Sequence, residues 1–356
     1  MRKGWPRAAA LSGAIAAALG ASSARAGSAI DDDEDVVLFT TAAHLEGRDW
    51  VVPVHAWVFE PERDSIWRNA VLRGLRHQLG IESGDPRAAR FALVARWFLV
   101  DNERGKRLDV RVGGTSIELP PTGASGHALG SVRVPAGGPG APGWLALEST
   151  ARDGRRFRGQ ALLVPPTGIS VVSDVDDTIK VTEVLAGKRR VLKRTFAEPF
   201  EPVAGMPELY RRWRAGGAVF HYVSASPWHL YPELNEFLRS GGFPEGTLDL
   251  RHFRVKDGTR WNLLGSPQPH KQAAIESLLA RFPRRRFVLV GDSGEIDPEI
   301  YGAIARAHPG RIAAIFIRRL PGDGWTAARR QRAFAGVRAP VVTFARPAEL
   351  PALTRL

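Results

Sequence analysis

Three aspartates follow one apolar segment, in ISVVSDVDDTIKVT at 169–182. They are close enough along the chain to act together in catalysis or in metal binding. Asp174, Asp176 and Asp177 stand close together, and like charges at such short range repel and raise each other's pKa. A buried strand that runs into several carboxylates is therefore expected to face a positive charge. Because carboxylate oxygens are hard ligands, a hard cation such as Mg²⁺ is suited to supply that charge.

Further polar groups stand where later apolar segments end. They are Ser224 at the end of AVFHYVS, Lys271 at the start of a helical segment, and Asp292 and Asp297 in GDSGEID after RFVLVG. Buried strands that alternate with helices imply a parallel sheet, and ligands gather at the carboxyl ends of its strands. We therefore expect carboxylates, a hydroxyl and a lysine to converge on one rim, which suits Mg²⁺ together with a phosphate.

Other interpretations of these residues are weaker. A calcium loop counted from Asp174 needs Gly and Glu where the chain has Ile179 and Leu185. A helix cap accounts for Asp177 but not for three carboxylates, and the chain has no GxxxxGK[ST] phosphate loop. For the lysine, Lys256 in VKDGTR is the alternative to Lys271, which we favour.

The blocks DVDDT, VSASP, Lys271 and GDSGEID, in this order, resemble the four motifs of the haloacid dehalogenase (HAD) superfamily of phosphohydrolases. Longer blocks are similar to the actin-patch type of phosphatidate phosphatases, which are relatives of the lipins and also occur widely in bacteria. These blocks are DVDDTIKVTEV, FHYVSASPWHLYPELNEFL and FPRRRFVLVGDSGEIDPEIY. The resemblance covers about residues 169 to 320, and Ala225 departs from it because similar sequences often carry a polar residue there.

The resemblance implies an α/β fold with a HAD-like Rossmannoid parallel sheet and a short cap, and a phosphatase that uses Mg²⁺ and an aspartyl-phosphate. Asp174 would be the nucleophile, and Asp176 would protonate the leaving alkoxide and then activate water. Both side chains can point the same way if the segment stays extended. Ser224 and Lys271 would bind the phosphoryl group, and Thr178 completes the catalytic motif. The implied metal ligands are Asp174, Asp176, Asp292 and Asp297.

The N-terminal half has a different pattern, of short alternating segments separated by turns. It predicts a mainly-β, sandwich-like domain at 35–165 with one helix at 65–80, and VPPTG at 164–168 separates it from an α/β phosphatase domain at 169–350. The predicted strands are VVPVHAWVF, RFALVARWFLV, RLDVRV, ALGSVRV, WLALES and GQALLV.

Residues 1–26 have the pattern of a cleaved secretory signal peptide, with a basic start, an apolar middle and a cleavage site after Ala26. We therefore expect export to the periplasm or secretion. The four basic residues of this segment are removed with it, which lowers the formal charge from +13 to +9. A basic balance favours anionic partners, and for an exported protein a lipid surface or a phosphorylated substrate fits better than nucleic acid. The chain has no cysteine, which excludes disulfides and a cysteine nucleophile.

The substrate is indicated by the short insert of about 45 residues between the first two motifs, which leaves no room for a large lid. The insert carries a basic cluster that is either a docking surface for anionic lipid headgroups or a solvated charged loop. Its members are Lys188, Arg189, Arg190, Lys193 and Arg194. The resemblance implies phosphatidate, dephosphorylated to diacylglycerol, whereas the residues alone indicate a phosphomonoester. A periplasmic phosphatase of soluble phosphomonoesters is the alternative, and the intact motifs argue against a lipid-binding module with vestigial catalysis.

Overall fold

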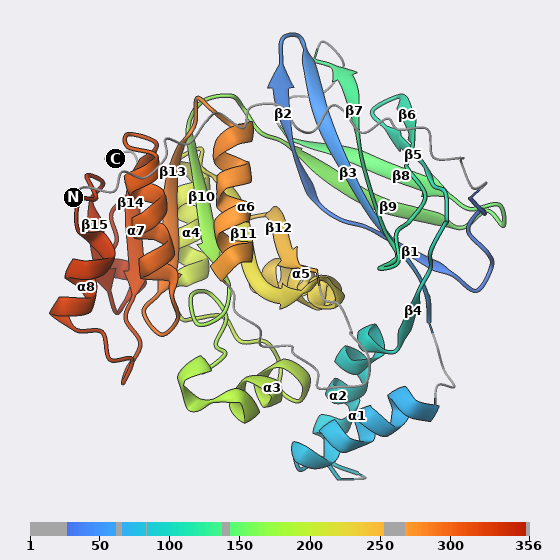
Figure 1. Cartoon of the computed structure of the whole chain (residues 1–356), viewed down its shortest axis with the longest axis horizontal. Coiled ribbons are helices and arrows are strands. Elements are labelled where there is room, and N and C mark those ends of the chain that lie inside the picture. Colours follow the sequence, from blue (N-terminus) through green and yellow to red (C-terminus); the bar gives the residue numbers. More distant parts are fainter. Residues whose placement is uncertain (1–26, 62–65, 83, 137–142, 253–267, 354–356) are drawn as a thin grey trace, which may run out of the picture.

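The structure is a computed structural model that describes residues 27–61, 66–82, 84–136, 143–252 and 268–353 (Figure 1). It contains two sheets, one formed before residue 164 and one after residue 168. The predicted signal peptide and Lys256 lie outside the described residues. Of the helices that are described, none combines the length and the apolar character needed to cross a bilayer.

The N-terminal sheet has nine strands in the order β1-β3-β2-β9-β8-β5-β6, with β4 and β7 also paired to β3. One hydrophobic cluster takes Val54 from β3, Val112 from β5, Leu147 from β8 and Ala161 from β9, so strands from both ends of this order pack on a common core. The strands are β1 (Asp35–Leu38), β2 (Thr41–Glu46), β3 (Asp49–Pro61), β4 (Val100–Asn102), β5 (Asp109–Val112), β6 (Thr115–Glu118), β7 (His127–Pro135), β8 (Trp144–Thr150) and β9 (Arg156–Leu163). The prediction of a mainly-β N-terminal region is confirmed.

One predicted strand of this region is wrong. The segment RFALVARWFLV begins inside helix α2 (Arg87–Ala95) and continues through the 3₁₀ turn η1 (Arg96–Phe98), next to the predicted helix α1 (Ile66–Gln78). Phe91, Val94 and Ala95 are buried, at the spacing of three and four residues that puts side chains on one helix face. A short apolar run does not distinguish a buried helix from a strand, which is why the sequence misled here.

The C-terminal sheet has six parallel strands in the order β12-β11-β10-β13-β14-β15. They are β10 (Ile169–Asp174), β11 (Val219–Pro227), β12 (Gly246–Arg251), β13 (Arg286–Asp292), β14 (Ile312–Arg318) and β15 (Val341–Phe344). The helices of this part are α3 (Lys188–Phe196), α4 (Met206–Ala215), α5 (Tyr231–Ser240), α6 (Gln268–Arg281), α7 (Asp297–Ala307) and α8 (Ala327–Phe334). This is the predicted α/β architecture with a parallel sheet.

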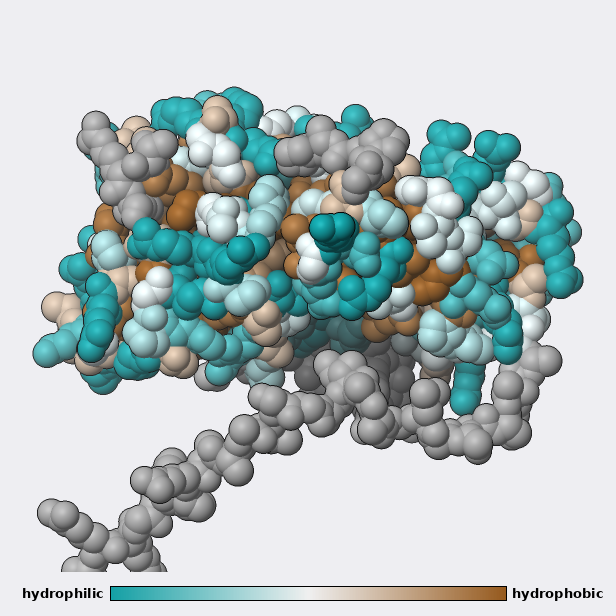
Figure 2. All heavy atoms as spheres, turned by 90° about the horizontal axis from the view of Figure 1, so that it is seen from above, coloured by the Kyte–Doolittle hydropathy of each residue, from teal (hydrophilic) through white to brown (hydrophobic). Residues whose placement is uncertain are grey.

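Helices cover both faces of the parallel sheet. α4 and α5 pack on one face through residues such as Leu209 and Phe237, and α6 and α7 pack on the other through residues such as Ile275 and Ile304. One apolar face of α6 and the residue that follows the helix are buried: Ala274, Ile275, Leu278, Leu279 and Phe282. With both faces covered, the carboxyl ends of the strands are left for ligands, and in Figure 1 they point toward α3. Figure 2 shows the molecule from above, which is the side away from these strand ends, and hydrophilic residues cover much of that surface.

The segment that joins the two sheets is fixed by one buried arginine. The Arg285 guanidinium donates hydrogen bonds to the carbonyl oxygens of Pro165, at 2.7 Å, and of Thr167 and Ile169. Its Nε also donates to Ser170 Oγ at 2.8 Å. Because buried carbonyl groups need hydrogen-bond partners, this single side chain satisfies the backbone of the turn between the sheets.

The two sheets also share a hydrophobic core. Phe39 packs on Trp228 and Tyr231, with ring centroids 4.5 Å and 4.7 Å apart. The Tyr231 hydroxyl accepts a hydrogen bond from the Thr40 backbone N–H at 2.9 Å, and Arg90 on α2 forms an ion pair with Glu233 on α5 at 2.7 Å. The N-terminal region is therefore packed directly on the half of the chain that forms the parallel sheet.

Buried histidines make stability depend on pH. Burial lowers the pKa of His127 and His221 to about 3 and that of His229 to about 4, and it lowers the pKa of His55 well below its usual value. His221 is hydrogen-bonded to Thr247 Oγ1 at 2.8 Å and contacts Ser170 Oγ at 3.3 Å. These rings stay neutral in the folded chain, whereas in the unfolded chain they take up protons below about pH 6.5.

We predict that the free energy of unfolding falls as the pH drops from about 6.5 toward 4, because the unfolded state then binds more protons. Each such histidine contributes up to about 2 kcal/mol between pH 6.5 and 5. Urea unfolding of the wild type and of His221→Gln, at pH 7.5 and 5, isolates one ring, since glutamine is polar and does not titrate in this range. If His221→Gln shows the same pH dependence as the wild type, the prediction is wrong.

Candidate active site

Asp174 is the last residue of β10, the strand between β11 and β13 in the parallel sheet. Its side chain is buried, and both carboxylate oxygens have partners. Thr178 Oγ1 donates to Oδ2 at 2.9 Å, and Lys271 Nζ lies 2.8 Å from Oδ1. The structure thus brings together three residues that the sequence predicts to be catalytic, because Asp174 contacts both Thr178 and Lys271.

Lys271 is 1% exposed and lies between two carboxylates of the site. Its Nζ is 2.5 Å from Asp297 Oδ1 and 3.4 Å from Glu295 Oε2, in addition to Asp174. Burial alone would lower the pKa of this ammonium, but Asp174 and Asp297 outweigh burial and raise the pKa of Lys271 well above its usual value. The lysine therefore remains a fixed positive charge beside Asp174.

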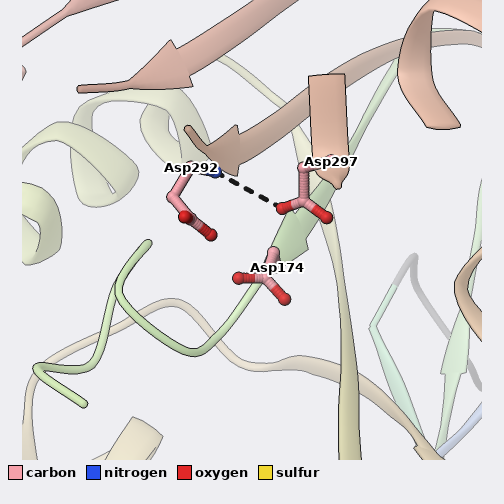
Figure 3. Close-up of side chains that lie close together, drawn as sticks. All are labelled: Asp174, Asp292 and Asp297. Carbon is pink, nitrogen blue, oxygen red and sulfur yellow. Dashed lines mark hydrogen bonds between the residues drawn. The ribbon is translucent and has the colours of Figure 1, made fainter. Parts of the chain in front are cut away.

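Three carboxylates gather beside Lys271. One oxygen atom each from Asp174, Asp292 and Asp297 lies within 4.8 Å of the others (Figure 3). Burial raises the pKa of Asp174 and of Asp292 well above the usual value, because the charged forms are separated from water and face one another. Asp292 Oδ2 is buried and has no hydrogen-bond partner within the part of the chain that the structure describes.

The donor set fits a hard divalent cation. It consists of carboxylate oxygens only, it carries more negative charge than Lys271 offsets, and it includes the unpartnered oxygen of Asp292. Asp174, Asp292 and Asp297 would hold the ion.

The end of β13 positions two of these carboxylates. Asp292 Oδ1 accepts backbone N–H groups of Gly294 at 2.6 Å and Glu295 at 3.1 Å, and Asp297 Oδ2 accepts the Asp292 N–H at 3.3 Å. A Cβ on Gly291 would collide with the Asp297 carboxylate and lie 2.8 Å from the Tyr301 ring. Glycine at 291 is therefore required for the start of α7 to approach the strand.

Asp176 is separate from the carboxylate cluster, although it follows Asp174 by two residues. The strand ends at Asp174, so the two side chains do not continue one extended face. Asp176 instead pairs with Lys180 Nζ at 2.8 Å and accepts hydrogen bonds from Thr182 Oγ1 at 2.7 Å and Ser224 Oγ at 3.1 Å. Asp176 is therefore not one of the three aspartates whose oxygens lie within 4.8 Å of one another, and its part as a metal ligand stays a prediction.

These contacts set the charge of Asp176. Burial would raise its pKa, but the neighbouring Lys180 ammonium and the hydrogen bonds from Lys180, Thr182 and Ser224 lower the pKa of Asp176 to about 2. Asp174 and Asp176 are therefore held in opposite electrostatic environments. Such a separation of pKa values is typical of carboxylates that have different roles in one reaction.

Ser224, the hydroxyl predicted for phosphoryl binding, lies at this second carboxylate. Its Oγ also accepts the N–H of Ser226 at 3.0 Å, and the Ser226 hydroxyl lies 3.4 Å from Asp176 Oδ2. The small side chain of Ala225 lines the cavity next to them. Ser224 is not the last residue of β11, which continues to Pro227 through an irregularity in its pairing with β12 after Val223.

Sequence reasoning missed Lys180, Thr182 and Glu295. The signal was present in IKVT, since Lys180 follows Asp176 by four residues and is 2% exposed in the structure. Asp177 has the cap-like role that was its alternative interpretation. Its backbone is left-handed at φ 51°, and its carboxylate accepts the N–H groups of Thr182, Glu183 and Val184.

The predicted basic cluster forms helix α3 and is not a loop. Arg190 Nε pairs with Glu183 at 2.7 Å, Arg194 Nε with the same carboxylate at 2.6 Å, and Lys193 with Glu198 at 3.3 Å. Lys188 and Arg189 are exposed. Three of the five predicted lipid-surface residues are therefore engaged in ion pairs within the insert, which leaves Lys188 and Arg189 as the exposed cations of the five.

Comparisons with known proteins agree with this geometry. Residues 169–319 match the model of the family described as phosphatidate phosphatase APP1, catalytic domain. The resemblance predicted for this segment is confirmed. The matched segment contains all three aspartates of the carboxylate cluster.

Two curated relatives match the same half of the chain. The phosphatidate phosphatase APP1 of Saccharomyces cerevisiae is 35% identical over 159 residues, which are 44% of this chain and 26% of that protein. An uncharacterized protein of Schizosaccharomyces pombe is 33% identical over 184 residues, which are 50% of this chain and 30% of that protein. The chain thus spans less than a third of the length of each relative.

A solved structure assigned as a beta-phosphoglucomutase of Thermotoga maritima overlaps with 51% of this chain and 95% of its own. Its TM-score is 0.31 at 16% identity. The parallel sheet is established by the strand pairing in this chain.

We predict that Lys271→Met destabilises the metal-free protein by up to about 3–5 kcal/mol, because it leaves buried carboxylates without their counter-charge. Added MgCl₂ should restore more stability to this variant than to the wild type, since the cation replaces the lost charge. Urea unfolding with and without MgCl₂ measures both effects, and Lys188→Met is the exposed control. Equal stability of Lys271→Met and the control in the absence of metal would contradict the assignment.

Proposed function

We propose that the chain is a Mg²⁺-dependent phosphomonoester hydrolase that works through an aspartyl-phosphate on Asp174, and that its substrate is phosphatidate. The observation that carries the proposal is the buried Asp174 carboxylate at a strand end, held by Lys271 and Thr178 beside two further aspartates. The match of residues 169–319 to a phosphatidate phosphatase catalytic domain supports the choice of substrate.

In the first step, an oxygen of Asp174 attacks phosphorus and the bond from phosphorus to the leaving alkoxide breaks. Two negative groups meet in this step, and Lys271 offsets their charge from 2.8 Å. A bound Mg²⁺ would supply further charge compensation and orient the phosphoryl oxygens. Ser224 would turn its hydroxyl from Asp176 to a phosphoryl oxygen.

Asp176 serves the proton transfers in this proposal. The incoming phosphate brings negative charge that raises the pKa of Asp176 from about 2, so that the carboxyl can carry the proton given to the leaving alkoxide. In the second step the ionised carboxylate takes a proton from the water that cleaves the aspartyl-phosphate. Lys180 and Thr182 hold the carboxylate between these transfers.

We predict that Asp174→Asn abolishes phosphate release, because the amide cannot form the acyl-phosphate, whereas Asp176→Asn slows it by roughly 10²–10⁴-fold. Chelation of the metal should silence the wild type. Phosphate release from phosphatidate vesicles and from a soluble ester is measured for each protein, with circular dichroism as the check on folding. Activity of Asp174→Asn near that of the wild type would refute the assignment of the nucleophile.

We also propose that the substrate is reached at an anionic membrane surface, after export through the predicted signal peptide. Lys188 and Arg189 are the exposed cations of α3, and Lys188 also lines the cavity that contains the catalytic carboxylates. Basic residues near an anionic surface contribute roughly 1 kcal/mol each to attraction. An exported phosphatase of soluble esters is the alternative that the next experiment separates.

We predict that replacing both Lys188 and Arg189 by glutamine raises the apparent KM on phosphatidate vesicles, and that salt weakens this difference because it screens surface charge over about 8 Å. The matched control replaces Arg190 and Arg194, which are engaged with Glu183, and should affect folding stability more than vesicle binding. Kinetics on vesicles and on a soluble ester are compared across a salt series. Equal losses on both substrates would show that the exposed pair does not act in docking.

A further inference from the structure

A cavity of about 260 Å³ opens directly from the catalytic carboxylates. Its polar end is formed by Asp174, Asp176 and Glu295, and Ser226 and Thr182 lie beside them. The rest of its wall is mainly apolar and comes from α3, from the strand end of β11 and from the N-terminal region. The apolar lining residues are Phe98, Val184, Val191, Leu192, Phe196, Pro227 and Leu230.

Helix α3 supplies one complete face to this cavity. Its lining residues are Lys188, Val191, Leu192, Thr195 and Phe196, which recur at the spacing of three and four residues that defines one side of a helix. Arg190 and Arg194 lie between these positions and form the ion pairs with Glu183 and Glu198. The charged side of α3 therefore anchors the helix, and its apolar side faces the cavity.

Residues of the N-terminal region pack against helix α3. Phe196, at the end of α3, is 1% exposed and packs on Phe98 and Phe91, with ring centroids 5.3 Å and 6.1 Å apart. Phe98 itself lines the cavity. The site thus includes a residue that lies outside the segment matched by the family model.

A phosphate group alone needs only the polar end of the cavity. Val191 and Leu192 are half-buried in the structure, so apolar surface remains for a ligand to cover. Because the same cavity contains Asp174, the carboxylate proposed to attack phosphorus, we expect the group that covers this surface to be attached to the phosphate. Apolar pocket walls with few polar groups at one end are typical of sites for ligands of this kind.

We propose that this cavity, the α3 pocket, binds the hydrocarbon part of the phosphomonoester substrate and makes α3 a specificity element. The inference rests on the proposed function for the identity of the phosphate end, and it adds a requirement for an apolar chain. Lys188, at the start of α3, would stay near the oxygen atoms between chain and phosphate, because it lines the same cavity.

Binding of alkylphosphonates tests the pocket without depending on turnover, since their carbon–phosphorus bond is not hydrolysed by a phosphatase of this kind. Calorimetric titration compares ethylphosphonate with hexylphosphonate in the presence of MgCl₂. Each additional methylene that enters the pocket should raise affinity roughly fourfold, which corresponds to about 0.8 kcal/mol. Hexylphosphonate should therefore bind at least tenfold more tightly than ethylphosphonate.

Two variants of the wall and one control locate the effect. Leu192→Gln and the isosteric Val191→Thr should reduce the affinity ratio of hexylphosphonate to ethylphosphonate. Leu93→Gln replaces an exposed leucine of α2 that does not line the pocket, and it should keep the wild-type ratio. A wild-type ratio near one, or an unchanged ratio in both wall variants, would overturn the proposal. Loss of phosphate release from every ester tested, with the binding ratio intact, would instead contradict the proposed function.

Discussion

The structure depends on the repulsion between carboxylates that are buried at the ends of two neighbouring parallel strands. Asp174 and Asp292 end β10 and β13, and Asp297 starts the helix that follows. Burying such charges together is costly unless positive charge is placed among them. Lys271 supplies one such charge, and among the residues that the structure describes Asp292 Oδ2 has no hydrogen-bond partner, which leaves it available to a cation. Because Gly291 has no side chain, the start of α7 can approach β13 closely enough to place Asp297 beside Asp292.

The same physical logic separates the two aspartates of the first motif. Asp174 faces like charges, and burial raises its pKa, whereas Asp176 is held by Lys180 and two hydroxyls and remains ionised. Two carboxylates that differ by two positions along the chain thus differ strongly in proton affinity. The difference comes from the end of the strand after Asp174, because the chain then turns and directs Asp176 to other partners.

Much of the site could be predicted, because the strands of a parallel sheet all place their carboxyl ends at the same edge. Asp174, Ser224 and Asp292 each stand at the end of an apolar run, and the sequence shows these positions directly. The spacing of four residues between Asp176 and Lys180 was a signal, but the contact itself depends on the path of a turn that the sequence does not show. Helix α3 was interpreted as a cluster of cations, because its apolar face becomes evident only when Phe98 and Phe196 meet.

The contacts of Arg285 with the segment between the two sheets limit where the chain can be divided. One guanidinium satisfies the carbonyl oxygens of Pro165, Thr167 and Ile169, and the residues on either side share a hydrophobic core. A segment cut at residue 169 would keep Arg285 and lose the acceptors Pro165 and Thr167, together with Phe39, which packs on Trp228 and Tyr231. All three aspartates of the carboxylate cluster lie after that cut, but the surroundings of their first strand are completed by residues that precede it.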